Sequence, residues 1–320
     1  MRVLVTGGSG FIGSHVIDRL GAHGHEARNL DLQPSPYGGV DTVIGDLLDG
    51  DAVRRALDGC DAVVHLAAVA DVNDVVADPR RAETINRYGT SVLLEAARRE
   101  GTPRVLYGST VWVYGDGAPG QTLDEDAPLP PPQHLYTATK LAGELLCATY
   151  GVEHTILRFG IPYGPRARAT TIVAAFVARA RAGSPLTIAG DGRQSRRFVY
   201  VDDLADGVVA ALAPVAAGRT YNLVGNESVT VREVADTVRE LVADVPVVHV
   251  EARPGDLHGA AISGDRAARE LGWRARTEFR TGVARYVEWV TAQQPTPSAA
   301  TASRIDGRAA AVLRQAPGEL

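Results

Sequence analysis

The chain has 320 residues, a hydrophobic fraction of 45% and a formal net charge of −5, which suits one large domain or two ordinary ones. The acidic balance leaves no electrostatic footprint for nucleic acid, no run of about 18 apolar residues is present to span a bilayer, and the N-terminus carries no signal-peptide pattern. The two cysteines lie far apart and suggest no disulfide framework, so we expect a cytoplasmic protein without nucleic-acid or membrane partners.

Apolar runs and amphipathic stretches alternate along the first half of the chain. Residues 1–24 contain a strand pattern, a glycine turn and a helix pattern. Further strand patterns follow at residues 25–32, 41–49, 60–68, 104–110 and 154–164, and helix patterns at 51–59, 81–101 and 136–151. This alternation predicts an α/β fold with a mostly parallel sheet that helices cover on both faces.

The second half of the chain is less regular. Its predicted elements are helices at 170–183, around 203–213 and 230–242, and at 279–293, with short strands at 185–190 and 196–201. Residues 293–320 lack core-forming side chains, which predicts a flexible C-terminal tail.

The first motif is the glycine-rich turn TGGSGFIG after the first strand pattern. Gly7, Gly10 and Gly13 allow the backbone to approach a pyrophosphate, and the helix that follows provides N–H donors and a positive dipole. Asp31 ends the second strand pattern, where a carboxylate binds ribose hydroxyls and repels a 2′-phosphate. Because no arginine immediately follows Asp31, and Arg28 lies earlier on the strand, the sequence favours NAD over NADP.

Two more segments are candidates for cofactor contact. Asp46 follows the third strand pattern, from which it would reach the adenine, although the same residue would also serve as a helix N-cap. Ala67 and Ala68 end the strand pattern at 60–68, where small side chains allow a cofactor to approach.

Tyr136 and Lys140 in YTATK are one helical turn apart and therefore share a helix face. Lys140 is the only lysine among 33 cationic side chains, which suggests a function that a guanidinium does not serve. An ammonium and a nicotinamide cation nearby would lower the pKa of the tyrosine, which would then move the proton of a substrate hydroxyl during hydride transfer. Thr110, at the end of its strand pattern, is the candidate to orient the substrate oxygen.

These motifs, together with HLAA, NRYGT, STVWVYG and RRFVYVDD, resemble the extended short-chain dehydrogenases/reductases, and more narrowly the NAD-dependent epimerase/dehydratase family acting on nucleotide sugars. The similarity runs from Met1 to about Trp289. It implies a Rossmann-type, doubly wound NAD-binding domain at 1–165 with return segments near 196–225, a smaller substrate-binding α/β domain at 166–292, and a homodimer formed through helices around 84–99 and 136–150.

Matching motif positions implies roles for individual residues. Thr110, Tyr136 and Lys140 correspond to the catalytic triad of the family. The residues implied in NAD binding are Gly7, Gly10, Phe11, Ile12, Gly13, Asp31, Asp46, Leu47, Leu66, Ala67, Ala68, Asn86, Tyr136 and Lys140. The residues implied in contacts with a nucleoside-diphosphate sugar are Thr110, Trp112, Arg166, Arg196 and Arg253.

The residues after Thr110 distinguish activities within the family. Sugar 4,6-dehydratases and glucuronate decarboxylases typically carry an acid there, because elimination needs a proton-transfer group besides the tyrosine. This chain has Val111 and Trp112, which transfer no proton, and Trp112 suits a pocket wall or plain core packing. The resemblance therefore favours a 4-epimerase, with a 4-ketoreductase or other dehydrogenase as the alternative and a dehydratase or decarboxylase less favoured.

One departure from the family concerns the substrate. The family usually has asparagine in R-x-x-N-x-Y-G-P, whereas RFGIPYGP has Ile161 there, so one diphosphate contact is lost or comes from elsewhere, such as Arg166 or Arg168. A non-enzymatic NAD-sensing scaffold is disfavoured by the intact tyrosine and lysine pair. His23 and His25 are predicted to lie in a helix-to-strand loop, so no metal site is expected.

Overall fold

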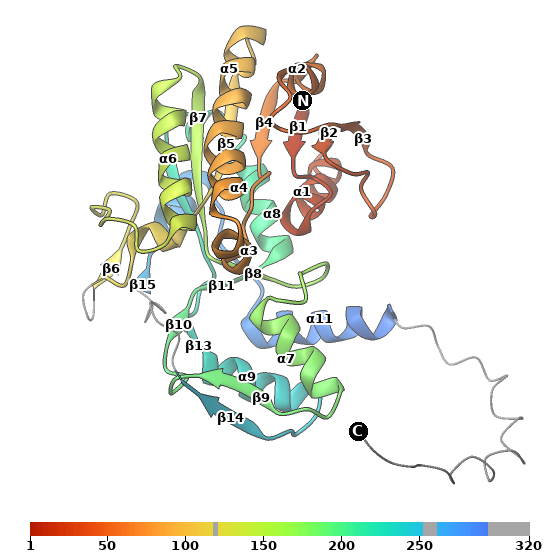
Figure 1. Cartoon of the computed structure of the whole chain (residues 1–320), viewed down its shortest axis with the longest axis vertical. Helices are drawn as coiled ribbons and strands as arrows, with labels where there is room; N and C mark the ends of the chain where they lie inside the picture. The colour runs from red at the N-terminus through yellow and green to blue at the C-terminus, as the bar shows by residue number, and fades with distance from the viewer. Residues whose placement is uncertain (118–120, 252–260, 294–320) are drawn as a thin grey trace, which may run out of the picture.

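The computed structural model describes residues 1–117, 121–251 and 261–293. Its main feature is a seven-stranded sheet of order β12-β7-β5-β4-β1-β2-β3, in which all neighbouring strands are parallel (Figure 1). These strands are β1 (Arg2–Thr6), β2 (Glu26–Asp31), β3 (Asp41–Ile44), β4 (Ala62–His65), β5 (Arg104–Thr110), β7 (Glu153–Phe159) and β12 (Thr220–Leu223). The predicted Rossmann-type α/β fold is confirmed.

Helices cover both faces of the sheet because consecutive residues of a strand point to opposite sides, and both sides are apolar here. The covering helices are α1 (Phe11–Ala22) and α8 (Val201–Ala210) on one face, and α2 (Gly50–Leu57), α5 (Thr90–Glu100) and α6 (Leu135–Thr149) on the other. Val3 and Val5 of β1 belong to the first core, with Leu204 of α8. Leu4, between them, belongs to the second core with Leu93 of α5.

The turn between β1 and α1 has no space for side chains at its glycines. Gly7 has a φ of +72°, and a Cβ on it would lie 2.8 Å from the backbone nitrogen of Ala67. A Cβ on Gly13 would lie 2.2 Å from the carbonyl oxygen of Gly7. Gly10 caps α1 without a side-chain hydrogen bond. The turn therefore packs tightly on the strand ends while the N-terminus of α1 stays open to a ligand.

The helix predicted at 81–101 is divided into several elements. The structure has α3 (Val72–Ala77), which was not predicted, then α4 (Pro79–Glu83), a π-helical turn η1 (Thr84–Gly89) and α5. A π turn inserts extra backbone, and such turns are frequent at functional sites. It contains Asn86, which is 2% exposed although asparagine is usually a surface residue.

Most elements of the second half form a smaller group that lies below the main sheet in Figure 1, joined to it by loops and short strands. The remaining elements are η2 (Val111–Tyr114), β6 (Thr122–Leu123), β8 (Ile161–Tyr163), α7 (Ile172–Arg181), β9 (Leu186–Ala189), β10 (Ser195–Arg196), β11 (Phe198–Tyr200), η3 (Pro214–Ala216), β13 (Val229–Thr230), α9 (Val231–Leu241), β14 (Val247–Val250), β15 (Ala261–Ile262), α10 (Asp265–Leu271) and α11 (Phe279–Ala292). The strand predicted at 196–201 is split, because β10 pairs with β13 and β11 pairs with β8.

The smaller group has a core of its own. Phe198 of β11 lies 5.1 Å from Phe279 of α11 between ring centroids, and both belong to one apolar cluster with Phe176 of α7. A division of the chain at residues 165 and 166 stays a prediction. Apart from Gln293, the tail predicted at 293–320 lies outside the described residues.

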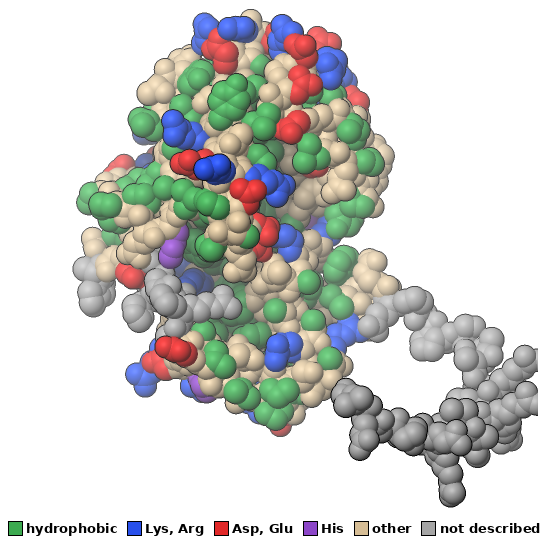
Figure 2. All heavy atoms as spheres, viewed as in Figure 1, with side chains coloured by type: hydrophobic (Ala, Val, Ile, Leu, Met, Phe, Trp, Pro, Cys, Tyr) green, Lys and Arg blue, Asp and Glu red, His purple; other side chains and the backbone are tan. Residues whose placement is uncertain are grey.

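On the visible face of the larger part, acidic and basic side chains are interspersed (Figure 2). Within residues 1–117, 121–251 and 261–293, no helix combines the length and the apolarity needed to cross a membrane.

Candidate active site

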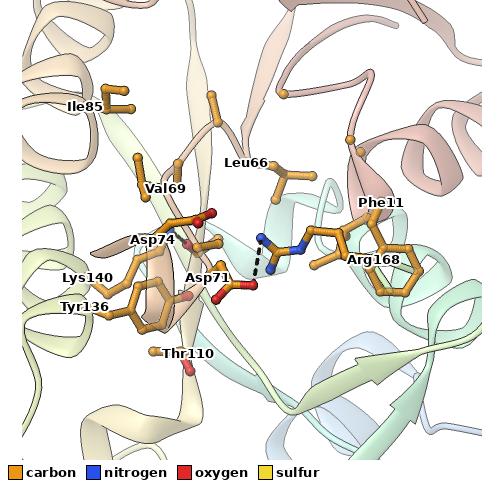
Figure 3. A pocket seen from close by; sticks show the side chains of 18 of the residues that line it. Phe11, Leu66, Val69, Asp71, Asp74, Ile85, Thr110, Tyr136, Lys140 and Arg168 are labelled. Carbon is orange, nitrogen blue, oxygen red and sulfur yellow. Dashed lines mark hydrogen bonds and ion pairs between the residues drawn. The ribbon is translucent and has the colours of Figure 1, made fainter. Parts of the chain in front are cut away.

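A cavity of about 770 Å³ lies at the carboxyl ends of the parallel strands, where open α/β sheets bind ligands. It extends from the glycine turn to the triad (Figure 3). Among the predicted residues, those that line it are Gly7, Gly10, Phe11, Ile12, Gly13, Asp31, Asp46, Leu47, Leu66, Ala67, Ala68, Thr110, Trp112, Tyr136 and Lys140. The structure thus brings both predicted motifs into one cavity.

The glycine-turn end of the cavity presents two carboxylates. Asp31 accepts a hydrogen bond from the backbone N–H of Ser9 at 3.1 Å, which holds the carboxylate against the turn. Asp46 accepts from the N–H of Leu48 at 2.9 Å, while the N-cap of α2 is Asp49. Asp46 is therefore not the helix cap that the sequence allowed, and it lines the cavity instead. Together with the uncapped helix and the tightly packed glycine turn, Asp31 fits the ribose hydroxyls of a dinucleotide, and Asp46 remains the candidate for the adenine.

Asn86 lies behind the cavity and does not line it. Its Oδ1 accepts from the backbone N–H of Val69 at 2.7 Å, and its Nδ2 donates to the carbonyl of Val69 at 3.0 Å and to Thr139 Oγ1 at 3.1 Å. The buried amide therefore satisfies both backbone groups of a cavity-lining residue and ties it to α6. Asn86 contributes to the site by holding the loop after β4 in place.

Lys140, the lysine of the predicted triad, is deeply buried. Its Nζ donates to the carbonyl oxygen of Gly108 at 2.8 Å and lies 5.1 Å from the centroid of the Tyr107 ring. Burial lowers the pKa of Lys140 from 10.5 to about 8. The ammonium is thus positioned by β5, the strand that also carries Thr110.

The pKa of Tyr136 is raised in the structure, whereas the sequence led us to expect that nearby cations would lower it. Burial raises the pKa of this phenol from 10.0 to about 12, and the guanidinium of Arg168 opposes the shift. The ring of Trp112 meets that of Tyr136 edge-on, with centroids 6.0 Å apart. The protein surroundings alone therefore favour the neutral phenol, because desolvation outweighs the neighbouring cation.

A buried polar cluster links the strand and the helix that carry the triad. Ser109 Oγ donates to Glu144, whose two carboxylate oxygens accept from Arg158 Nε at 3.1 Å and Nη2 at 2.7 Å. Arg158 also donates to Tyr114 Oη at 2.8 Å. Because these residues come from β5, α6, β7 and η2, the cluster ties the strand of Thr110 to the helix of Tyr136.

Of the three arginines predicted for the substrate, the two that the structure describes, Arg166 and Arg196, do not line the cavity. Arg166 has a φ of +64°, its guanidinium pairs with Asp18 at 2.7 Å and it lies over the ring of Tyr37. Arg196 lies on β10 and donates to the carbonyl of Ser195. Arg253 lies outside the described residues. Arg168, which was only an alternative, does line the cavity.

Several polar residues of the cavity were missed. Asp71 and Asp74 line it from α3, and Thr170 from the loop before α7. Asp71 Oδ2 accepts from Thr170 Oγ1 at 2.9 Å and lies 3.9 Å from Nη1 of Arg168, an ion pair drawn in Figure 3. The signal in the sequence was DVND, a segment with two acids that begins three residues after HLAA.

Comparisons with known proteins agree with this geometry. A model described as the NAD dependent epimerase/dehydratase family matches residues 3–224. Over 310 residues the chain is 33% identical to a UDP-glucose 4-epimerase of Mycolicibacterium smegmatis, covering 90% of this chain and 98% of that protein. Over 312 residues it is 31% identical to a dTDP-glucose 4,6-dehydratase of Streptomyces niveus, covering 90% and 92%. The solved UDP-glucose 4-epimerase of Thermus thermophilus in complex with NAD superimposes with a TM-score of 0.84 at 34% identity, covering 92% of this chain and 100% of that one.

Proposed function

The chain is an enzyme of the NAD-dependent epimerase/dehydratase family with NAD as its cofactor, and within that family we propose that it is a nucleoside-diphosphate-sugar 4-epimerase. The proposal rests mainly on the apolar side chains of the two residues that follow Thr110. Val111 is buried in an apolar cluster with Val113 and Leu123, and Trp112 lines the cavity against Tyr136. The two residues directly after Thr110 therefore provide no proton-transfer group.

The proposed reaction needs one proton-transfer group and one orienting hydroxyl. Bound NAD would supply the hydride acceptor for C4. The resulting 4-keto sugar would turn over in the cavity, so that the same hydride returns to the opposite face of C4 and the configuration is inverted. Tyr136 would take the proton of the C4 hydroxyl and return it, and Thr110 would orient that oxygen. Lys140, held by the carbonyl of Gly108, would stabilise the phenolate while it lasts. The raised pKa of Tyr136 makes this stabilisation necessary, since burial alone disfavours the phenolate.

A 4,6-dehydratase is the second candidate, because the cavity does contain carboxylates outside the Thr110 segment. Hydrogen bonds from Thr170 and from the N–H of Asn73 lower the pKa of Asp71 despite its burial, so it has no proton to donate near neutral pH. Asp74 is the carboxylate left for proton transfer. The dehydratase from Streptomyces niveus among the relatives gives this candidate further weight.

Turnover without added cofactor tests the proposal. Purified protein is incubated with UDP- and dTDP-hexoses, and the products are separated by ion-pair chromatography. We expect interconversion of C4 epimers without added NAD, because the cofactor is regenerated in every cycle. A stoichiometric requirement for NADH would support the 4-ketoreductase alternative, and a 4-keto-6-deoxy product would support the dehydratase.

We also propose that the protein is a homodimer formed through η1, α5 and α6. Two large apolar side chains on these elements support it, Tyr88 at 59% exposure and Leu145 at 66%. Burying such side chains against a second copy would stabilise association by the hydrophobic effect. Sedimentation velocity distinguishes the dimer from a monomer of 33.8 kDa.

A further inference from the structure

Helix α3 presents two carboxylates to the cavity, and they differ in whether the protein donates hydrogen bonds to them. Asp71 caps the helix through Oδ1, which accepts from the N–H of Asn73 at 2.9 Å, and its Oδ2 accepts from Thr170. Asp74 lies one helical turn later and therefore on the same side of α3. Within the part of the chain that the structure describes, no side chain or backbone N–H donates to the Asp74 carboxylate.

The Asp74 carboxylate lies on the triad side of the cavity. Val75, the next residue of α3, belongs to one apolar cluster with Val69 and Tyr136, so α3 packs beside the catalytic tyrosine. Figure 3 shows Asp71 and Asp74 on the same side as Thr110, Tyr136 and Lys140, with Phe11 opposite. A sugar whose C4 hydroxyl meets Tyr136 would therefore lie next to α3.

Asp74 is exposed, so its carboxylate is hydrated until a sugar lies beside it, and the sugar must then replace the water as hydrogen-bond donor. The carboxylate only accepts hydrogen bonds, so it is satisfied by hydroxyl or amino groups and repels a second carboxylate. Besides Lys140 of the triad, the described arginine and lysine side chains that line the cavity are Arg168 and Arg81. Arg168 already pairs with Asp71. Arg81 of α4 would attract the carboxylate of a uronate, which opposes the effect of Asp74, so a separate variant tests its contribution.

We propose that Asp74 is a specificity-determining residue that accepts a hydrogen bond from a hydroxyl or amino group of the sugar, so that the site prefers neutral or amino hexoses to uronates. This inference rests on the proposed function, because that function defines where the sugar lies. It adds the class of sugar, which the triad and the NAD-binding residues leave open.

Binding of UDP-glucose and UDP-glucuronic acid tests the inference, since the two ligands differ only at C6. Calorimetric Kd values are measured for the NAD-loaded parent, Asp74→Asn, Arg81→Gln and the control Glu83→Gln. Glu83 is exposed on α4 and does not line the cavity, so its substitution removes the same charge outside the site. If only dTDP sugars bind, dTDP-glucose and dTDP-glucuronic acid replace the two UDP sugars.

We expect the parent to bind the uronate about tenfold more weakly, which is about 1.4 kcal/mol and roughly what two like charges ~6 Å apart produce at an intermediate dielectric. Asp74→Asn should reduce the ratio to about threefold or less, Arg81→Gln should widen it, and Glu83→Gln should leave it unchanged. Equal affinities in the parent, an unchanged ratio in Asp74→Asn, or an equal effect of Glu83→Gln would overturn the inference.

Activity separates this inference from the proposed function. If the parent prefers the neutral sugar but forms no C4 epimer, the proposed function fails and the specificity role of Asp74 stands. If epimers form and Asp74→Asn does not change the preference, the inference fails and the function stands. If Asp74→Asn keeps its Kd values but loses ~10³-fold or more in kcat, Asp74 transfers a proton and its recognition role is wrong.

Discussion

Replacing Lys140 by methionine should raise stability at neutral pH while removing activity. The ammonium is 5% exposed, and burial lowers its pKa from 10.5 to about 8. A shift of this size means that holding the charge in the folded state costs about 3 kcal/mol at pH 7. Methionine has a similar length and no charge, but it loses the hydrogen bond to Gly108, worth about 2 kcal/mol for a charged donor. We therefore expect Lys140→Met to be about 1 kcal/mol more stable than the parent at pH 7.

The pH dependence of the stability difference between the parent and Lys140→Met tests the reasoning more sharply than the difference at pH 7 alone. The folded pKa lies below the unfolded one, so between pH 8 and 10.5 the unfolded parent binds more protons than the folded parent. The parent should therefore gain about 3 kcal/mol relative to Lys140→Met as the pH rises through this range, and become the more stable of the two by about 2 kcal/mol. Comparing the two proteins cancels the other groups that titrate there.

Denaturant unfolding of nucleotide-free protein at pH 7, 8, 9 and 10 measures this difference. Lys140→Arg is the matched control, because its guanidinium does not titrate, and its stability relative to Lys140→Met should not change with pH. We expect both variants to lose most activity at neutral pH, since neither places an amine at Gly108. A parent that shows no gain over Lys140→Met between pH 8 and 10 would refute the reasoning.

Three further substitutions test the cavity. Asp31→Ala should weaken NAD binding by about tenfold or more and narrow the preference for NAD over NADP. The reason is that Asp31 lines the cavity beside the glycine turn, where its carboxylate would accept hydrogen bonds from the ribose. A parent protein whose Kd for NADP is lower than its Kd for NAD would contradict the assignment. Tyr136→Phe should reduce kcat by ~10²–10⁴-fold with little change in NAD affinity, since only the proton-transfer group is lost; turnover at the parental rate would exclude Tyr136 from the chemistry. Asn86→Ala should destabilise the fold by about 2–4 kcal/mol in denaturant titrations, because it leaves the buried N–H and C=O of Val69 without partners; an unchanged midpoint would show that the amide does not hold the loop.

Local patterns predicted the sheet and most of the described candidate residues that the structure brings to one cavity. The strands are continuous apolar runs, since both faces of the sheet are covered, and such runs are visible without knowledge of their partners. The glycine turn, Asp31, Tyr136 and Lys140 each follow from short-range spacing along one strand or one helix. These residues line one cavity because parallel strands end at a common edge.

The features that the sequence did not predict depend on contacts between residues that are distant in sequence. Periodicity does not reveal the extra backbone of η1, so the helix at 81–101 was predicted as continuous. Arg166 was predicted to replace the diphosphate contact that Ile161 does not make, whereas in the structure its guanidinium contacts Asp18 and Tyr37. Asp71 and Asp74 have the spacing of an ordinary solvated helix face, and only the packing of α3 beside Tyr136 makes them part of the cavity.

The central claim is that this chain inverts C4 by removing and returning one hydride without exchanging any carbon-bound hydrogen with solvent. The most direct measurement is mass spectrometry and proton NMR of the product formed from a UDP- or dTDP-hexose in D₂O, without added NAD. The account predicts the C4 epimer with its C4 hydrogen retained and no deuterium at any carbon. Deuterium at C5, or a product that has lost water or CO₂, would contradict it, because a second proton-transfer group such as Asp74 would then have to act on the sugar.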